Sequence, residues 1–432
     1  MFGDTGGAMN GWRASQSVVV RSGGPIDIDV VVPGSKSIAN RTLVIAALSP
    51  GRSSLSNVPD GDDVAAMKGA LRSLGILVEE SAGSIHVTGP LDINGTENLE
   101  LDARLAGTTS RFLIALSALR HGRTTISGEG RLRERPFAEL VEAIRHLGAN
   151  VEGGPGLPIS VSRGDLRGGT VSMNGSVSSQ FVSALMMIGP FLSGGLRIEL
   201  TGEVVSASYI EMTGSLMTHF GARVAIDGRV IDVAEGEYRA TNLDIEPDAS
   251  SASYPAAFAA IAGGSARISQ GATVRLQSDR VVFAILRRMG CSVEDVGDDI
   301  VVRRDPSSAL IAVDVDLRDS SDLVPTIAAV AATARGTTRI RGVGFIRQKE
   351  SDRIADLAKE LRRFGVEVRE DADGLDIVGG PLTSASVDPH HDHRLAMALS
   401  LLGWNAEGTV ISDSRVVAKS WPSYFADMGL SQ

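Results

Sequence analysis

Apolar residues spaced three and four positions apart recur along the chain and predict amphipathic helices. One such run, Phe137, Leu140, Val141, Ile144 and Leu147, ends at a glycine. Glycine stops a helix at such a position because it tolerates the left-handed conformation of the C-terminal cap. The same ending occurs at six places, which are Leu74-Gly75, Leu147-Gly148, Phe220-Gly221, Met289-Gly290, Phe364-Gly365 and Met428-Gly429.

A second series of helical stretches is interleaved with the first. Its members, such as residues 256–262, are apolar nearly all round, which is typical of buried helices. Each member leads through a glycine into a strand-like run, and these glycines are Gly51, Gly122, Gly195, Gly264, Gly336 and Gly408. Successive members lie 64 to 75 residues apart in the first series and 69 to 73 residues apart in the second.

The two matching periods predict an α/β fold of six units, each with two helices and several strands. Solenoid repeats are usually shorter, about 20 to 45 residues, so we expect globular lobes instead. A chain of 432 residues is also too long for one ordinary core. We therefore predict two lobes of three units, with a break near residues 242–247 and a cleft between the lobes.

Composition and charge argue against several kinds of protein. The formal net charge of −10 argues against a general nucleic-acid binder or a binder of anionic membranes, because both need a basic surface. No run approaches the roughly 18 apolar residues of a membrane helix. Residues 1–15 are polar and lack the features of a secretory signal, so we expect a flexible extension there. The single cysteine, Cys291, excludes an internal disulfide and fits a reducing compartment, so we expect a cytoplasmic location.

The segment Pro33–Arg41 carries the richest candidate chemistry. It places Lys36, Ser37 and Arg41 at the start of a predicted helix, where backbone N–H groups and the helix dipole favour an anion. It is not a nucleotide-binding P-loop, because the Gly-Lys step is missing. A capped helix with solvated basic residues explains this segment, taken alone, equally well.

Further cations and hydroxyls recur near predicted helix starts. In an acidic protein such repetition predicts a polyanionic ligand, because guanidinium groups suit carboxylate and phosphate oxygens. Any one of the cations alone is better explained as part of a surface ion pair. A plain helix cap explains one of the serines but not the whole cluster. The residues concerned are Arg131, Arg133, Arg135, Ser178, Ser179, Gln180, Lys349, Arg353, Arg394 and Lys419.

Two features that suggest other chemistry are better explained structurally. The run from His390 to His393 invites a metal site, but adjacent residues cannot easily share one ion and no HExxH or Cys partner accompanies them. Cys291 follows a predicted helix stop with no histidine near it, so we expect a small buried residue. No metal and no cofactor is expected.

Taken together, the motifs resemble the 5-enolpyruvylshikimate 3-phosphate synthase family, in its order and across essentially the whole chain. They are Pro33–Arg41, Leu105-Ala106-Gly107-Thr108, Glu134-Arg135-Pro136, Gly175–Gln180, Lys349–Arg353, Asp392-His393-Arg394 and Ala418-Lys419.

This resemblance implies an inside-out α/β barrel arrangement, with two lobes of three βαβαββ units and the active site in the cleft. The implied lobes are residues 31–245 and residues 16–30 plus 246–432. The implied reaction transfers the enolpyruvyl group of phosphoenolpyruvate to the 5-hydroxyl of shikimate 3-phosphate, and the implied state is a monomer that uses only these two small substrates.

The resemblance also implies roles for individual residues. Asp322 and Glu350, with Lys36, match the catalytic positions, Asp322 at the 5-hydroxyl and Glu350 near the methylene of phosphoenolpyruvate. The positions that match the shikimate 3-phosphate site are Lys36, Ser37, Arg41, Ser178, Ser179, Gln180, Ser206, Tyr209, Asp322 and Lys349. Those that match the phosphoenolpyruvate site are Lys36, Gly107, Arg135, Gln180, Arg353, Arg394 and Lys419.

Two positions depart from the family pattern and bear on inhibitor response. Leu105 stands where the family often has Asn, and Phe112 stands where many members have Pro, so sensitivity to glyphosate does not follow from the resemblance. Two other functions remain open. A UDP-N-acetylglucosamine enolpyruvyl transferase shares the fold but usually carries a reactive loop cysteine, and a non-catalytic anion-binding protein could use the same scaffold.

Overall fold

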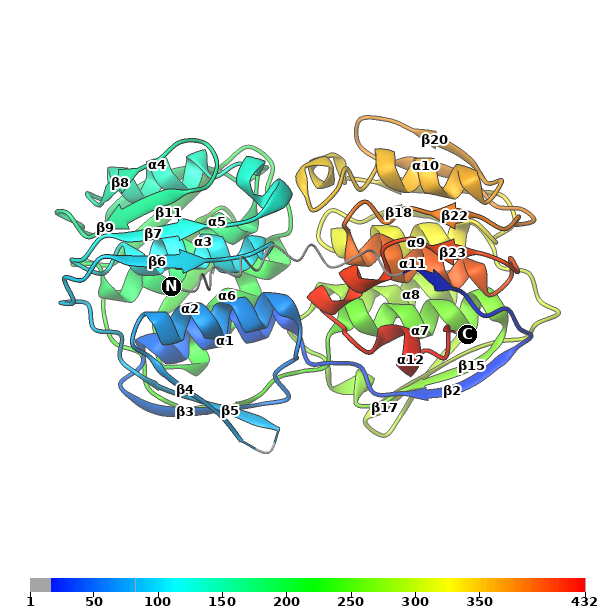
Figure 1. The fold of residues 1–432 in the computed structure, drawn as a ribbon, viewed down its shortest axis with the longest axis horizontal. Helices are drawn as coiled ribbons and strands as arrows, with labels where there is room; N and C mark the ends of the chain where they lie inside the picture. Colours follow the sequence, from blue (N-terminus) through cyan, green and yellow to red (C-terminus); the bar gives the residue numbers. More distant parts are fainter. Residues whose placement is uncertain (1–16, 82, 432) are drawn as a thin grey trace, which may run out of the picture.

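The computed structural model describes residues 17–81 and 83–431, so the predicted extension at residues 1–15 lies outside the described residues. Two lobes lie side by side (Figure 1). One contains the helices α1 to α6, and the other contains α7 to α12 together with strand β2 from near the start of the chain.

The first lobe has three four-stranded sheets, in the orders β14-β3-β5-β4, β6-β7-β9-β8 and β10-β11-β13-β12. In each sheet the first two strands are parallel and the other pairs are antiparallel. The strands are β3 Gly51–Ser56, β4 Leu77–Ser81, β5 Ser84–Gly89, β6 Leu99–Asp102, β7 Thr124–Ser127, β8 Asn150–Glu152, β9 Ile159–Ser162, β10 Gly169–Asn174, β11 Leu196–Thr201, β12 Val224–Asp227, β13 Val230–Val233 and β14 Asn242–Asp244.

The second lobe repeats this pattern in the sheets β2-β15-β17-β16 and β18-β19-β21-β20. Its third sheet has three strands in the order β1-β23-β22. In this sheet β22 and β23 are parallel, and β1 from near the start of the chain pairs antiparallel with β23. The strands are β1 Val18–Val19, β2 Ile26–Val30, β15 Gly264–Ile268, β16 Ser292–Val296, β17 Asp299–Arg304, β18 Asp314–Asp316, β19 Thr337–Arg341, β20 Glu367–Glu370, β21 Leu375–Val378, β22 Ser386–Val387 and β23 Val410–Ile411.

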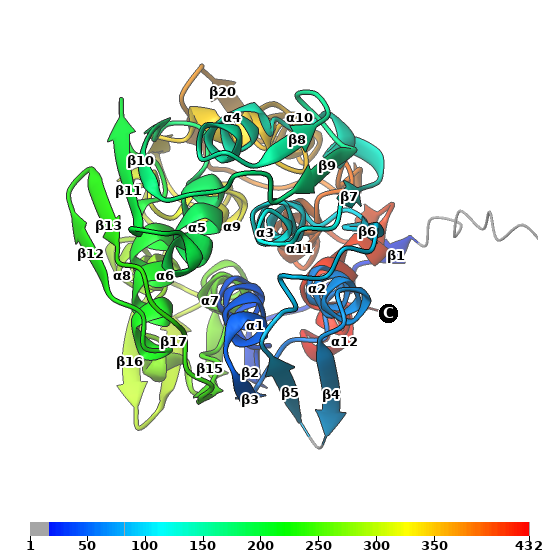
Figure 2. The same cartoon turned by 90° about the vertical axis from the view of Figure 1, so that its left-hand side faces the viewer.

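Each unit contributes two helices, and the sheets surround them on the outside of the lobe (Figure 2). One helix of each unit is buried on nearly all sides: α1 Lys36–Leu48, α3 Gly107–Ser117, α5 Ser179–Ile188, α7 Ala249–Ala262, α9 Val324–Ala331 and α11 His393–Gly403. The others are α2 Asp62–Ser73, α4 Ala138–His146, α6 Ala207–His219, α8 Val281–Arg288, α10 Ala355–Arg363 and α12 Tyr424–Asp427. Short 3-10 helices are η1 Gly130–Glu134, η2 Gly189–Phe191, η3 Gly271–Thr273, η4 Ser278–Arg280, η5 Ser321–Leu323, η6 Gly344–Gln348 and η7 Ser414–Lys419.

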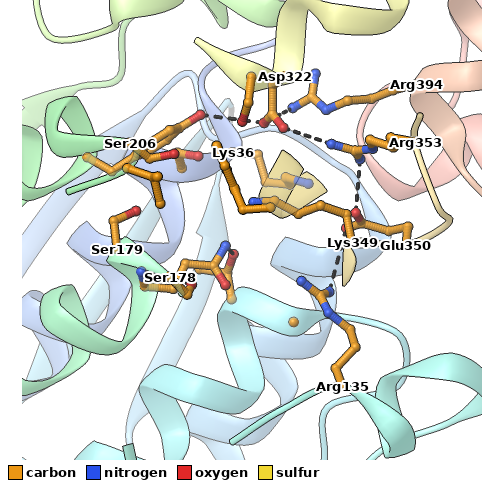
Figure 3. A pocket seen from close by; sticks show the side chains of 18 of the residues that line it. Lys36, Arg135, Ser178, Ser179, Ser206, Asp322, Lys349, Glu350, Arg353 and Arg394 are labelled. Carbon is orange, nitrogen blue, oxygen red and sulfur yellow. Dashed lines mark hydrogen bonds and ion pairs between the residues drawn. The ribbon is translucent and has the colours of Figure 1, made fainter. Parts of the chain in front are cut away.

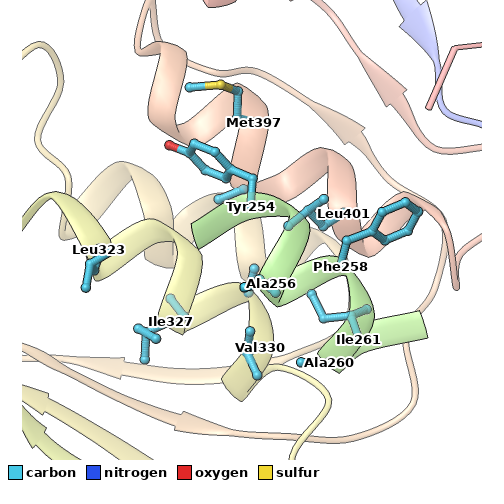
Figure 4. Packing of buried hydrophobic residues seen from close by; sticks show 14 of the residues in the cluster. Tyr254, Ala256, Phe258, Ala260, Ile261, Leu323, Ile327, Val330, Met397 and Leu401 are labelled. Atoms are coloured by element: carbon cyan, nitrogen blue, oxygen red, sulfur yellow. The ribbon is translucent and has the colours of Figure 1, made fainter. Parts of the chain in front are cut away.

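The apolar core divides into two clusters, one within residues 38–245 and one that joins residues 20–32 to residues 252–430. In the second cluster α7 packs against α9 and α11, with Tyr254 and Phe258 on α7 near Met397 and Leu401 (Figure 4). The predicted burial of 256–262 is confirmed as far as Ile261, while Ala262 is half-buried at the helix end.

The chain passes between the lobes at two adjacent places. Gly34 and Pro247 form an antiparallel bridge, and the amide of Ser35 donates to the Glu246 carbonyl at 2.8 Å. Strand β2 therefore completes a sheet of the second lobe, and β14 completes one of the first. The crossings lie close to the predicted lobe boundaries at 30/31 and 245/246, although Val32 still packs in the core of the second lobe, and the boundaries stay a prediction.

The prediction of six α/β units in two lobes is confirmed. All six glycines of the first series have positive φ, from 63° at Gly429 to 104° at Gly290, as expected for residues that end helices. The strands form six separate sheets and no closed barrel within the described residues. In that part of the chain, no helix is both long and apolar enough to span a bilayer.

Candidate active site

A polar pocket of about 50 Å³ lies between the lobes. Of the residues that the resemblance assigns to the site, only Lys419 is not part of its lining, and the Nζ of Lys419 lies 3.4 Å from Glu350 Oε1. The candidate cations Arg131 and Arg133 do not line this pocket. The predicted residues that line the pocket are Lys36, Ser37, Arg41, Gly107, Arg135, Ser178, Ser179, Gln180, Ser206, Tyr209, Asp322, Lys349, Glu350, Arg353 and Arg394.

The first lobe presents the starts of its helices to this pocket. The Ser35 hydroxyl caps α1 and the Ser178 hydroxyl caps α5, where it accepts from the Gln180 amide at 3.3 Å. Gly107 begins α3, and a Cβ there would lie 2.4 Å from Nη1 of Arg135. The predicted helix starts are therefore confirmed, and a side chain at position 107 would displace the Arg135 guanidinium from this place.

Arg41 reaches the pocket as a buried cation. Its guanidinium donates to the Thr213 hydroxyl at 2.7 Å, the Ser37 carbonyl at 2.9 Å and the Ser183 hydroxyl at 3.1 Å. Its Cζ lies 5.3 Å from the centre of the Phe112 ring, which packs behind it. Burial lowers the pKa of Arg41 to about 10, so it remains charged at neutral pH.

The second lobe presents Asp322 at the centre of two ion pairs (Figure 3). Asp322 accepts from Arg353 at 2.9 Å and from Arg394 at 2.6 Å. It lies in η5, next to α9, whose cap is Leu323 without a side-chain hydrogen bond, so Asp322 is not a helix cap. Burial by itself raises the pKa of Asp322, but Arg394 and Arg353 outweigh burial and hold the pKa below its usual range.

Glu350 lies where cations from both lobes converge. It accepts from Arg353 at 2.9 Å, and the Arg135 guanidinium of the first lobe lies 3.8 Å away (Figure 3). Burial raises the pKa of Glu350, but Arg353, Lys419 and Arg135 together hold it well below its usual range. Both predicted catalytic carboxylates are therefore ionised at neutral pH in this arrangement.

Lys349 differs from these cations because it has no close carboxylate partner in the described part of the chain. Its Nζ lies 5.7 Å from the Phe345 ring centre. Burial lowers the pKa of Lys349 to about 8, which leaves a fraction of the amine neutral near neutral pH.

Several residues that support the site were missed at the level of sequence. Asp392 accepts from Arg353 at 2.7 Å while it caps α11, and Asp63 lies 3.0 Å from the Lys36 ammonium. His393 also lines the pocket, and neither of its ring nitrogens has a hydrogen-bond partner in the described structure. The Asp-His-Arg motif contained two of these residues, but only their partners in space reveal what they contact.

The histidine run does not form a metal site. His390 lies 3.0 Å from Glu360 and the exposed His391 lies 3.3 Å from Asp413, so the two point to different partners. Among residues 17–81 and 83–431, no group of three His, Cys, Asp or Glu side chains is arranged to hold a metal ion. Cys291 is buried, as predicted.

Comparisons with known proteins agree with this geometry. The family model for EPSP synthase (3-phosphoshikimate 1-carboxyvinyltransferase) matches residues 20–428. The 3-phosphoshikimate 1-carboxyvinyltransferase of Trichormus variabilis is 39% identical over 408 residues, covering 93% of this chain and 95% of the relative. That of Methanospirillum hungatei is 36% identical over 412 residues, covering 94% and 96%.

A solved structure supports the fold independently. The EPSP synthase of Acinetobacter baumannii superposes with a TM-score of 0.79 at 24% identity, covering 96% of this chain and 98% of that one. Because the family model spans nearly the whole described sequence, this chain belongs to the EPSP synthase (3-phosphoshikimate 1-carboxyvinyltransferase) family.

Proposed function

We propose that this protein transfers the enolpyruvyl group of phosphoenolpyruvate to the 5-hydroxyl of shikimate 3-phosphate and releases phosphate. One observation carries the proposal: two ionised carboxylates, Asp322 and Glu350, share Arg353 in a pocket ringed by cations from both lobes. Family membership agrees with this reaction.

The cations suit phosphoenolpyruvate, which carries a phosphate and a carboxylate. Arg353 and Arg394 would bind its carboxylate, because guanidinium groups pair with carboxylates in a bidentate way. Lys36, Arg135 and Lys419 would surround its phosphate, with Gly107 and Gln180 beside it. The phosphate and carboxylate of phosphoenolpyruvate would then replace Asp322 and Glu350 as partners of the guanidinium groups.

The other wall suits shikimate 3-phosphate. Arg41 and Lys36 supply charge, and side chains at the starts of α1, α5 and α6 supply neutral donors. The proposed neutral contacts are Ser37, Ser178, Ser179, Gln180, Ser206 and Tyr209. Asp322 and Lys349 would then lie at the 5-hydroxyl.

The chemistry requires one base and one group that moves a proton twice. Asp322, or the neutral form of Lys349, takes the 5-hydroxyl proton while the oxygen bonds to C2 and C3 gains a proton from Glu350. Glu350 then takes a proton back from C3 as the C2–O bond to phosphate breaks. Because substrate anions offset its neighbouring cations, their binding raises the pKa of Glu350 and lets it carry the proton it must donate.

A coupled assay of phosphate release tests the proposal. Phosphate should appear only with phosphoenolpyruvate and shikimate 3-phosphate together, and UDP-N-acetylglucosamine should not replace the acceptor. Phosphate release with phosphoenolpyruvate and UDP-N-acetylglucosamine, but not with shikimate 3-phosphate, would show instead that the protein is a UDP-N-acetylglucosamine enolpyruvyl transferase. Binding of both anions without turnover would leave an anion-binding protein. Monomeric state, cytoplasmic location and glyphosate response remain predictions that this assay does not address.

A further inference from the structure

Arg111 is a buried arginine of α3 that lies just behind the pocket wall and has no role in the reaction described above. Only 2% of its surface is exposed. Its Cζ lies 5.0 Å from the Phe137 ring centre and 5.2 Å from that of Phe181. Its guanidinium forms no ion pair within the described residues, so two aromatic rings take the place of a carboxylate.

The hydrogen bonds of Arg111 go to two residues that line the pocket. Nη1 donates to the Gly107 carbonyl at 2.9 Å and to Oε1 of Gln180 at 3.0 Å. Nε2 of Gln180 donates to the Thr108 hydroxyl at 3.0 Å. The Gln180 side chain is thus held between two residues of α3 while it lines the pocket.

A guanidinium can only donate hydrogen bonds, so Arg111 decides which way the Gln180 amide faces. The Thr108 hydroxyl could donate or accept and would tolerate either orientation. Arg111 can donate only to the amide oxygen, which leaves the NH₂ group of Gln180 toward Thr108 and the pocket. One of its two N–H groups binds Thr108, and the other is available to a ligand oxygen.

We infer that Arg111 is a positioning residue that makes Gln180 a hydrogen-bond donor toward the anionic substrates. This inference rests on the proposed function, because it concerns how Gln180 meets phosphoenolpyruvate and shikimate 3-phosphate. Without Arg111 the amide could turn its oxygen toward substrate oxygens, which would replace an attraction by a repulsion. The aromatic rings matter because they hold the cation without a carboxylate that would compete for its donors.

A double-mutant cycle tests the inference. Arg111→Met keeps an apolar side chain between Phe137 and Phe181 but removes the donor, and Gln180→Ala removes the amide. Each should raise the KM for the substrates about 3- to 10-fold, the value of one hydrogen bond. If Arg111 acts through Gln180, Arg111→Met should add little in the Gln180→Ala background. Arg111→Lys, which restores a donor-only cation, should recover part of the loss.

Arg120→Met is the matched control. Arg120 is also buried in the first lobe, but it contacts Thr124 and Glu97 outside the pocket. It should lower the melting temperature and leave both KM values unchanged. Fully additive effects of Arg111→Met and Gln180→Ala, or an Arg111→Met that lowers only the melting temperature, would overturn the inference. Turnover of the unchanged protein tests the proposed function separately.

Discussion

Two buried arginines of the first lobe and two of the second lobe are held near the cleft by different kinds of partner. In the first lobe, Arg41 and Arg111 lie against aromatic rings and donate to neutral oxygens. In the second lobe, Arg353 and Arg394 pair with carboxylates, and Arg353 contacts three of them. Both sets are buried, so exposure does not explain the difference.

The pKa directions follow from these partners. Burial lowers the pKa of Arg41, and burial followed by Arg135 lowers that of Arg111 well below its ordinary value. Burial also opposes the charge of Arg353, but Asp392, Glu350 and Asp322 outweigh it and raise the pKa. Within the described residues, Arg41 and Arg111 therefore have no ion-pair partner, whereas Arg353 and Arg394 already share carboxylates. The contrast concerns these four arginines, because Lys36 and Arg135 of the first lobe do lie near Asp63 and Glu350.

The largest expected effect is the loss of a reacting carboxylate from the second lobe. Glu350→Gln keeps the side-chain shape but cannot move a proton, so kcat should fall about 10²–10⁴-fold, the typical value of a general acid–base group. Arg353 keeps Asp322 and Asp392, so the fold should persist. Steady-state turnover and melting temperature should be measured on one preparation. Near-normal kcat with a lowered melting temperature would leave Glu350 as a structural partner only.

A second experiment compares stability when one arginine is removed from each lobe. Arg353→Met leaves the fully buried Asp392 carboxylate without its ion-pair partner, so the free energy of unfolding should fall by about 3–5 kcal/mol. Arg41→Met leaves no carboxylate without a partner. The Thr213 and Ser183 hydroxyls that lose Arg41 are already hydrogen-bonded to each other at 2.8 Å. Arg41→Met should therefore lower the melting temperature much less while abolishing most acceptor binding. Equal losses of stability would contradict the distinction between the lobes.

The sequence could predict a structural feature where residues a few positions apart determine it. Helix ends at glycine and caps such as Ser178 are set by residues a few positions apart, so their pattern was readable. The partners of the arginines are not local: Arg353 and Asp392 are 39 residues apart, and Arg41 and Thr213 are 172 apart. Charge and motif order identified the arginines that gather at the pocket, but they also pointed to Arg131 and Arg133, which do not line it. Only the packing of the six units determines which arginines pair with carboxylates and which lie against aromatic rings.

The pH dependence of activity sharpens the comparison at Lys349, the second-lobe lysine that lines the pocket without a close carboxylate in the described structure. Because the pKa of Lys349 is lowered to about 8, its neutral form increases as pH rises through this value. If neutral Lys349 is the base, kcat/KM should rise over that range, since this ratio reports the free enzyme. Lys349→Arg should abolish this limb and lower the rate. A profile without the limb would leave deprotonation to Asp322, which is ionised throughout.

The smallest expected effect comes from the ring behind Arg41. Phe112→Leu keeps an apolar side chain but removes the aromatic face, and a cation–π contact contributes about 0.5–2 kcal/mol. Shikimate 3-phosphate should therefore bind about 2- to 30-fold more weakly by calorimetry, while the KM for phosphoenolpyruvate stays the same. Phe112→Tyr, which keeps the ring, should bind like the unchanged protein. If Phe112→Leu and Phe112→Tyr weaken acceptor binding equally, the aromatic face of Phe112 does not contribute to holding Arg41. The hydrogen bonds of Arg41 would then be what keeps this cation in place.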